Sequence, residues 1–437
     1  MNSAIKTPSD TIYFGPIALA PGITRINVSA KLFTAFVAIA MLSGMSFLQP
    51  YILTEHLNIP RNQHGTVSGN LAFWTEIVAI LLYSPFGILG DRIGRRPVLV
   101  FGILMMGLGF GLYPYATSTT ELTVFRMAYA VGMTATTGML ATISNDYPQD
   151  RSRGKLIGLS AMFNVTGTIF MSLFVARIPY MMIEQGFDPI AGGKAMYLFA
   201  AMLCLTAALV GKFWLAEGTV VKKKERAAYR ELIISGFHAG RNPRIAIAYA
   251  SAFIARADMV IKAMFLALWA IQAGSQMGLR PDQAMARFGI MYVAMYAVSF
   301  FSAPIFGWYI DKVNRVTSMI TALAIAAAGY LAMRLIDSPL ELSSMPFLML
   351  LTLGSSCMLK ASLSLVGQEA PARERGSIIS FSSMCGAVGI LIFTLVGGRL
   401  FDSWAPWAPF YIAGVYQVVL LVFAIVVRKV APGANPK

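Results

Sequence analysis

Charged residues are scarce in this sequence. Only 13% of its 437 residues are Asp, Glu, Lys or Arg, against about 25% in a typical soluble chain, whereas 57% are hydrophobic. Too few charges remain to cover a water-facing surface, which excludes a soluble globular fold. Repeated apolar stretches of about 20 residues predict helices that cross a hydrocarbon core of ~30 Å. We therefore expect an all-α membrane protein.

Cysteine and histidine are also rare, with three of each. The cysteines all lie inside apolar runs and the histidines outside them, so neither a disulfide framework nor a Cys/His metal cluster is expected. The chain also has no pairing of a nucleophile with a base. We expect no enzyme activity, no cofactor and no metal site. The residues concerned are Cys204, Cys357, Cys385, His56, His64 and His238.

We expect no cleavable signal peptide, because the first thirty residues lack a basic region followed by an apolar run. Apolar runs between charged or Pro/Gly-rich segments predict twelve spanning helices. They lie at about 33–54, 66–89, 97–117, 123–145, 156–176, 195–213, 246–272, 288–310, 316–333, 345–367, 377–398 and 409–427. The implied divisions are an N-terminal tail (1–32), a six-helix bundle (33–213), a linker (214–245), a second six-helix bundle (246–427) and a C-terminal tail (428–437).

The basic residues predict the orientation. With both termini cytoplasmic, roughly 24 of the 35 Lys and Arg residues lie on the inner side and roughly 7 on the outer side. This distribution predicts that both tails lie on the cytoplasmic side, and we expect the chain in a cell membrane. It also explains the net charge of +15 without nucleic acid.

The two halves repeat one another. The loop after the second predicted helix reads GILGDRIGRR, and the loop after the eighth reads GWYIDKVNR, with Asp and Arg in matching order. The loops after the fourth and tenth helices, NDYPQDRSRG and QEAPARERG, match as well. A duplication of six helices in parallel register predicts a pseudo-two-fold axis along the membrane normal, with a cavity between the halves.

The loop GILGDRIGRR resembles the signature loop of the major facilitator superfamily of secondary transporters, and the resemblance covers essentially the whole chain. It implies two six-helix bundles that close alternately on a cavity, and a loop that acts as a conformational latch between the halves. The alternative is a loop that only fixes the topology. The matching residues are Gly87, Gly90, Asp91, Arg92, Gly94, Arg95 and Arg96, with Asp311 and Arg315 in the second copy.

Other motifs of the superfamily match this sequence less well or are missing. Arg126 resembles its helix-4 arginine, often tied to proton coupling, although Ala130 stands where glycine is usual. An arginine reaching to the outer membrane surface is the alternative. The proline-containing pattern of antiporters is missing from 158–167, and the sugar-porter signatures are missing too.

The predicted spans contain few charged residues, and most fall on the helices that line the cavity in the superfamily. A charge at the bilayer centre costs about 2.5–3.5 kcal/mol, so these residues are candidates for substrate binding or coupling. They are Glu76, Arg126, Arg256, Asp258, Lys262 and Lys360.

The spacing within the seventh predicted helix gives these charges different roles. Asp258 and Lys262 are four residues apart, so we expect them to share a face and form an ion pair. Arg256 points elsewhere, toward Glu76 of the other half or toward substrate. The alternatives are a purely structural pair, an Arg256 capped by backbone carbonyls, a Lys360 that reaches the inner surface, and a Glu76 that is simply a buried protonated carboxyl.

The functional hypothesis is a monomeric secondary active transporter for a small organic anion or zwitterion, working by alternating access as a proton symporter. Its partners are the small-molecule substrate, protons and the lipid bilayer. Efflux of drug-like or amphiphilic compounds is the first alternative. A transporter-like sensor or assembly factor that moves nothing is the second.

Overall fold

A computed structural model describes residues 12–149, 152–217, 236–370 and 375–433, and it is almost entirely helical. Twelve helices of at least 18 residues occupy the described chain, six in each half. The first six are α1 (Arg25–Tyr51), α2 (His64–Ile93), α3 (Arg95–Leu112), α4 (Thr119–Asp146), α5 (Arg153–Leu173) and α7 (Pro189–Trp214). The second six are α9 (Pro243–Gln276), α10 (Pro281–Lys312), α11 (Arg315–Ala332), α12 (Met345–Glu369), α13 (Arg375–Ser403) and α14 (Ala408–Val430).

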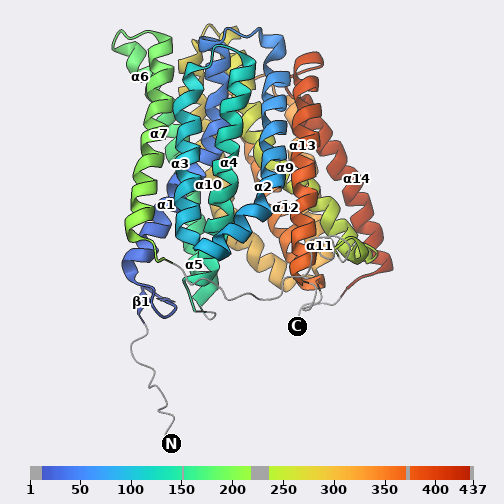
Figure 1. Cartoon of the computed structure of the whole chain (residues 1–437). Helices are drawn as coiled ribbons and strands as arrows, with labels where there is room; N and C mark the ends of the chain where they lie inside the picture. The colour runs from blue at the N-terminus through green and yellow to red at the C-terminus, as the bar shows by residue number, and fades with distance from the viewer. Residues whose placement is uncertain (1–11, 150–151, 218–235, 371–374, 434–437) are drawn as a thin grey trace, which may run out of the picture.

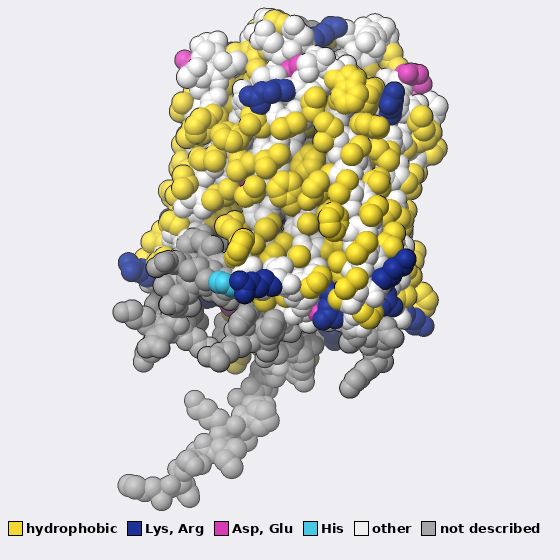
Figure 2. All heavy atoms as spheres, turned by 90° about the vertical axis from the view of Figure 1, so that its right-hand side faces the viewer, with side chains coloured by type: hydrophobic (Ala, Val, Ile, Leu, Met, Phe, Trp, Pro, Cys, Tyr) yellow, Lys and Arg dark blue, Asp and Glu magenta, His cyan; other side chains and the backbone are white. Residues whose placement is uncertain are grey.

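The helices run side by side along the long axis of the molecule (Figure 1). On the face shown in Figure 2, apolar side chains form a broad band across the middle, and basic side chains gather toward the two ends. Ten helical segments are long and apolar enough to cross a membrane. The expected all-α membrane fold with two six-helix bundles is thereby confirmed.

The two long helices outside that set are α4 and α9. Each helix is unusually polar for one that spans a membrane. α4 is rich in threonine and contains Arg126, and α9 contains Arg256, Asp258 and Lys262. These two helices therefore depend most on their neighbours for burial of polar groups.

Short elements connect the long ones. A hairpin pairs β1 (Tyr13–Phe14) with β2 (Ile17–Ala18) in antiparallel register. The short helices that lie wholly within the described residues are α6 (Ile178–Glu184), a π-helix at Ile52–His56, and 3₁₀ turns at Arg61–Gln63, Tyr113–Tyr115, Val175–Arg177, Met333–Leu335 and Leu342–Ser344. We call the end of the molecule with the hairpin and the α2–α3 turn the hairpin end, and the end with α6 the far end (Figure 1).

The first helix begins earlier than the hydropathy pattern predicts. Thr24 and Asn27 form a capping box that starts α1 at Arg25, so Lys31 belongs to the helix rather than to a tail. The preceding hairpin packs onto the α4–α5 loop, where Ser152 accepts a hydrogen bond from the backbone N–H of Ala18 at 3.0 Å. The predicted linker falls largely on residues 218–235, which lie outside the described residues.

Candidate functional site

The two halves are joined most tightly at the far end, between α2 and α13. Gly65 and Gly398 lie so close that a Cβ on either would collide with the backbone of the other. Asp402 of α13 accepts hydrogen bonds from the backbone N–H groups of Gly65 at 2.8 Å and Thr66 at 2.6 Å. These N–H groups belong to the first turn of α2, where a negative charge is favoured. Asp402 therefore caps a helix of the other half.

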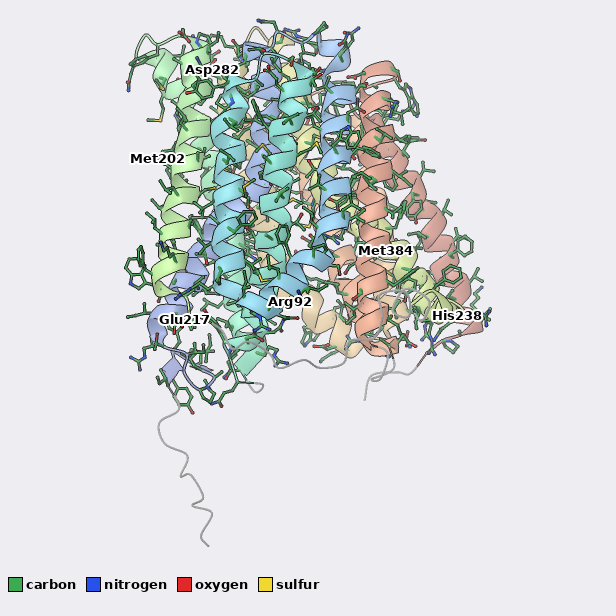
Figure 3. The ribbon with its side chains drawn as sticks, viewed as in Figure 1. Arg92, Met202, Glu217, His238, Asp282 and Met384 are labelled. Atoms are coloured by element: carbon green, nitrogen blue, oxygen red, sulfur yellow. The ribbon has the colours of Figure 1, made fainter. Side chains whose placement is uncertain are left out.

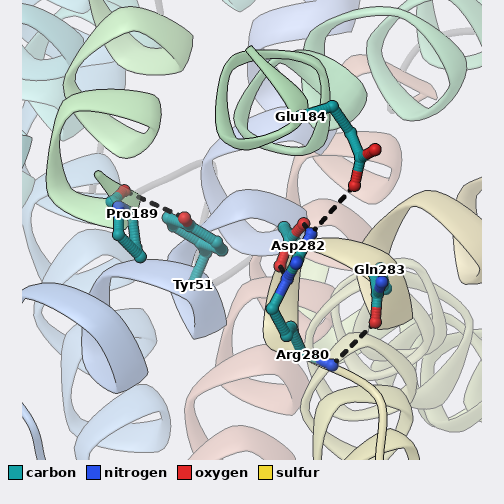
Figure 4. A network of polar contacts seen from close by, with 6 residues as sticks. All are labelled: Tyr51, Glu184, Pro189, Arg280, Asp282 and Gln283. Atoms are coloured by element: carbon teal, nitrogen blue, oxygen red, sulfur yellow. Dashed lines mark hydrogen bonds and ion pairs between the residues drawn. The ribbon is translucent and has the colours of Figure 1, made fainter. Parts of the chain in front are cut away.

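A second polar contact at the far end links α6 to the start of α10 (Figure 4). Arg280 forms an ion pair with Glu184 of the first half at 3.3 Å and with Asp282 of its own half at 3.1 Å. Hydrogen bonds to these carboxylates raise the pKa of Arg280. Below this contact, the Phe47 ring stacks on Phe288 with centroids 5.5 Å apart. The far end is thus closed by both charge and aromatic packing.

At the hairpin end, the signature loops bind their own halves. Arg95 pairs with Asp146 at the end of α4 at 2.9 Å, and a longer contact of 3.9 Å joins it to Asp91. In the second half, Arg315 pairs with Asp311 at 3.0 Å and donates to Gln368 at the end of α12 at 3.1 Å. The two loops that match in sequence therefore also make similar polar contacts, each with the nearby helix end of its own half.

The remaining residues of the first signature loop shape the α2–α3 turn. Gly94 has φ +95°, a conformation that glycine adopts readily, and it starts α3. Gly90 packs against Met139, whereas Gly87 has open space beside it. Arg96 pairs with Glu217 at 3.0 Å, and Arg92 is exposed at the hairpin end (Figure 3).

The alternative hypothesis that Arg126 reaches to the outer membrane surface is wrong. Its side chain is 3% exposed, and it donates from all three guanidinium nitrogens to neutral oxygens: Thr75 at 3.0 Å, Gln49 at 3.2 Å and Ser46 at 3.1 Å. Tyr113 also donates to the Gln49 side chain at 3.0 Å. Arg126 is thus the centre of a buried polar network that ties α1, α2 and α4 together.

Glu76 and Arg256 approach each other from opposite halves. Glu76 on α2 is 6% exposed, and Arg256 on α9 is the cation whose charge acts on it. Within the described residues, no Lys or Arg nitrogen lies within 4.0 Å of the Glu76 carboxylate, so the two groups are neighbours rather than an ion pair. Arg256 donates to the Ser383 carbonyl at 3.1 Å, and its stem lies over Gly386, where a Cβ would collide with it.

The predicted ion pair between Asp258 and Lys262 is wrong. The two side chains share a face of α9, but Lys262 donates to the Ser355 hydroxyl of α12 instead. Asp258, 1% exposed, accepts a hydrogen bond from Gln417 of α14 at 3.4 Å. Spacing along one helix could not show that two other helices would supply these partners.

Two further lysines lie within the spanning helices. Lys360 on α12 is partly buried and close enough to Lys262 for the two charges to repel. Lys31 on α1 is 1% exposed and donates to Ser160 of α5. Sequence reasoning missed Lys31 because it stood before the first predicted span; the capping pattern at Thr24 was the available signal.

Comparison with known proteins identifies the family. The model of the Major Facilitator Superfamily matches residues 32–339 and 249–437. The chain is 29% identical to the magnetosome protein MamH of Paramagnetospirillum magneticum over 87% of this chain and 88% of MamH. It is 21% identical to the multi-drug resistance efflux pump PmrA of Streptococcus pneumoniae, over 84% of this chain and 88% of that protein.

Solved structures show the same fold. The crystal structure of the nucleoside transporter NupG matches with a TM-score of 0.73 and 14% identity, over 93% of this chain and 100% of NupG. The family model covers both bundles, and the neighbour has the same architecture. The chain belongs to the Major Facilitator Superfamily and is a membrane transporter.

Proposed function

We propose that this protein is a proton-coupled secondary transporter of a small organic anion or zwitterion, and that Arg256 is its main substrate-binding residue. Arg256 lies where the halves face each other, and one of its nitrogens donates to a backbone carbonyl. A guanidinium has five N–H donors, so further donors are available for a ligand. Its planar fork suits a carboxylate or phosphate group.

The charges around Arg256 support an anionic ligand. Lys262 and Lys360 lie on neighbouring helices of the same half, and Glu76 faces Arg256 from the other half. Three cations against two nearby carboxylates, Glu76 and Asp258, leave a net positive charge that favours a ligand with a negative charge. A zwitterion could also place its ammonium group near Glu76, which we propose as the proton carrier.

The asymmetry of the contacts between the halves supports alternating access. Asp402 and Arg280 join the halves at the far end, whereas Arg95 and Arg315 pair within their own halves at the hairpin end. We interpret this as the state open toward the hairpin end. In the opposite state, the signature loops would contact the other half, with Asp91 and Arg92 as the latch residues.

The proposed location is the cell membrane, with both termini in the cytoplasm and the protein acting as a monomer. The similarity to MamH makes a magnetosome fraction the alternative location. Immunoblots of the two membrane fractions distinguish these locations. Protease access to a tag on each terminus in sealed cells tests the orientation.

Efflux of drug-like compounds is the second candidate function. The similarity to the efflux pump PmrA favours it, because that similarity extends over most of both chains. In that case lipophilic cations or neutral amphiphiles, rather than anions, should bind.

The test is the thermal stability of the purified protein against anionic, zwitterionic and cationic compounds at two pH values. A ligand present at 100 times its Kd should stabilise the folded state by about 2.7 kcal/mol. We expect stabilisation by anions or zwitterions, its loss in Arg256→Ala and partial recovery in Arg256→Lys. Stabilisation only by lipophilic cations, or an anion response that is equal in Arg256→Ala, would contradict the proposal.

A further inference from the structure

A groove of about 450 Å³ lies between α2 and α4 near the far end. The two helices that form its walls run side by side (Figure 1). Trp74 of α2 is 44% exposed in this groove, and Val124 of α4 is 56% exposed. The groove is separate from the contact between the halves, because α2 packs against α13 through another face, which contains Gly65 and Gly69. It therefore opens toward the surrounding membrane.

The lining of the groove changes from polar to apolar with depth. Both helices begin at the far end, where Thr119 and Thr120 form the first turn of α4. Asn70 lies about 9 Å along α2 from its start, at about 1.5 Å per residue. Met127 and Trp74 lie deeper, about 12 and 15 Å from the starts of their helices. This order matches one leaflet of a bilayer, in which polar headgroups lie above acyl chains.

Asn70 lies at the boundary between these two regions. α2 has 30 residues and is about 45 Å long, so a hydrocarbon core of ~30 Å centred on it begins about 7 Å from its start. The Asn70 side chain is exposed there and makes no hydrogen bond within the described residues. An amide without a partner is costly where water is scarce. The ester groups of a phospholipid lie at the same depth and supply acceptor oxygens.

The charges around the groove restrict the type of headgroup. Among the described residues that line it, none is Lys, Arg, Asp or Glu. Glu121, in the first turn of α4, is exposed at the depth of the headgroups. A negative charge at this level disfavours an anionic lipid and favours one with an ammonium group.

We propose that this groove binds one zwitterionic phospholipid of the leaflet at the far end. Asn70 and Thr120 donate hydrogen bonds to its ester or phosphate oxygens. One acyl chain lies along Trp74, Val124 and Met127. The lipid is a bound partner of the protein, and the proposal does not depend on which substrate is transported.

The lipid would stabilise the two helices from outside the bundle. Thr75, next to Trp74, turns inward and accepts a hydrogen bond from Arg126 Nε at 3.0 Å. The Arg126 network therefore joins α2 to α4 on the inner side, and the lipid joins them on the outer side. Because the groove needs both helices in place, the lipid binds the folded protein and should raise its stability.

The experiment combines native mass spectrometry with melting temperatures of the full-length protein in detergent. Delipidated protein is titrated with phosphatidylethanolamine, which is zwitterionic, or phosphatidylglycerol, which is anionic. The zwitterionic lipid should raise the melting temperature saturably and at a lower concentration than the anionic lipid. Val124→Trp fills the groove, so it should retain one phospholipid fewer than the wild type and lose the response. Val422→Trp on α14 is the matched control, because Val422 is 57% exposed, and it should behave as the wild type does.

A second variant guards against loss of folding in Val124→Trp. Asn70→Leu removes the amide and keeps a side chain of similar size, so the half-saturating concentration of phosphatidylethanolamine should rise several-fold. Asn70→Gln, which keeps an amide, should recover part of the affinity. Arg256→Ala should keep the lipid response, so failure of the anion proposal can be told apart from failure of this one.

Three results would overturn the proposal. The first is a wild type that responds to neither phospholipid or to phosphatidylglycerol alone. The second is a response of Val124→Trp or Asn70→Leu equal to that of the wild type. The third is stabilisation by a lipophilic cation that Val124→Trp abolishes, without any phospholipid response, which would assign the groove to an amphiphilic compound instead.

Discussion

Replacing Asp402 with asparagine should open the far end of the molecule. The Asp402 carboxylate holds two backbone N–H groups of the first turn of α2, at 2.8 and 2.6 Å. Asparagine retains one acceptor oxygen and no charge, so one hydrogen bond is lost and the other becomes neutral. Because these bonds cross between the halves, we expect the change to affect their relative position more than the folding of either half.

The size of the effect follows from the contacts. A hydrogen bond to a charged group contributes about 1.5–3 kcal/mol, and a negative charge at a helix N-terminus contributes about 0.3–1 kcal/mol. Asp402 is only partly buried, so solvent screens these terms. A net loss of about 1.5 kcal/mol changes the ratio of the two conformations roughly tenfold.

The assay is a distance measurement across the far end. Asn62 and Ala405 line a groove of about 310 Å³ beside Asp402. Spin labels on Asn62→Cys and Ala405→Cys, with the three native cysteines replaced, should give one short distance in the parent protein. Asp402→Asn should add a longer distance. Equal distributions in Asp402→Asn and in Asp337→Asn, an exposed carboxylate in the same half, would refute the reasoning.

Three other substitutions test separate parts of the structure. Gly398→Ala should separate the halves more than Asp402→Asn does, because its methyl group would collide with the Gly65 carbonyl; the same spin-label distances measure this. Arg126→Gln leaves the buried oxygens around it without their donors and should lower the unfolding free energy by about 3 kcal/mol, seen as a lower melting temperature. Gly94→Ala forces alanine into φ +95° and should cost about 1–2 kcal/mol, with a melting temperature equal to wild type as the contrary result.

The helices were predictable because burial in lipid demands long apolar runs, and the repeat was predictable because the loop motifs recur. The exact helix starts were not. α1 begins at Arg25 because of a cap at Thr24, whereas the hydropathy pattern starts the helix only after Lys31, a charged residue that is nonetheless buried. Hydropathy reports the average polarity of a segment, not whether one ammonium finds a hydroxyl on another helix.

The positions of charged residues within the spans could be predicted, but not their partners. Spacing correctly placed Asp258 and Lys262 on one face, yet each binds a side chain from a different helix. Likewise, Ser46 and Gln49 turn toward Arg126, which no single-helix pattern could reveal. Contacts between helices depend on rotation and tilt, which the sequence of one helix does not specify.

The central claim is that the protein moves an anion or zwitterion across the membrane rather than only binding it. The direct test is uptake, into proteoliposomes, of the compound that most stabilises the purified protein, with and without a pH gradient. The account predicts uptake that is accelerated by the proton gradient and lost in Arg256→Ala. Binding without uptake in the wild type would contradict it and would identify the protein as a sensor or assembly factor with a transporter fold.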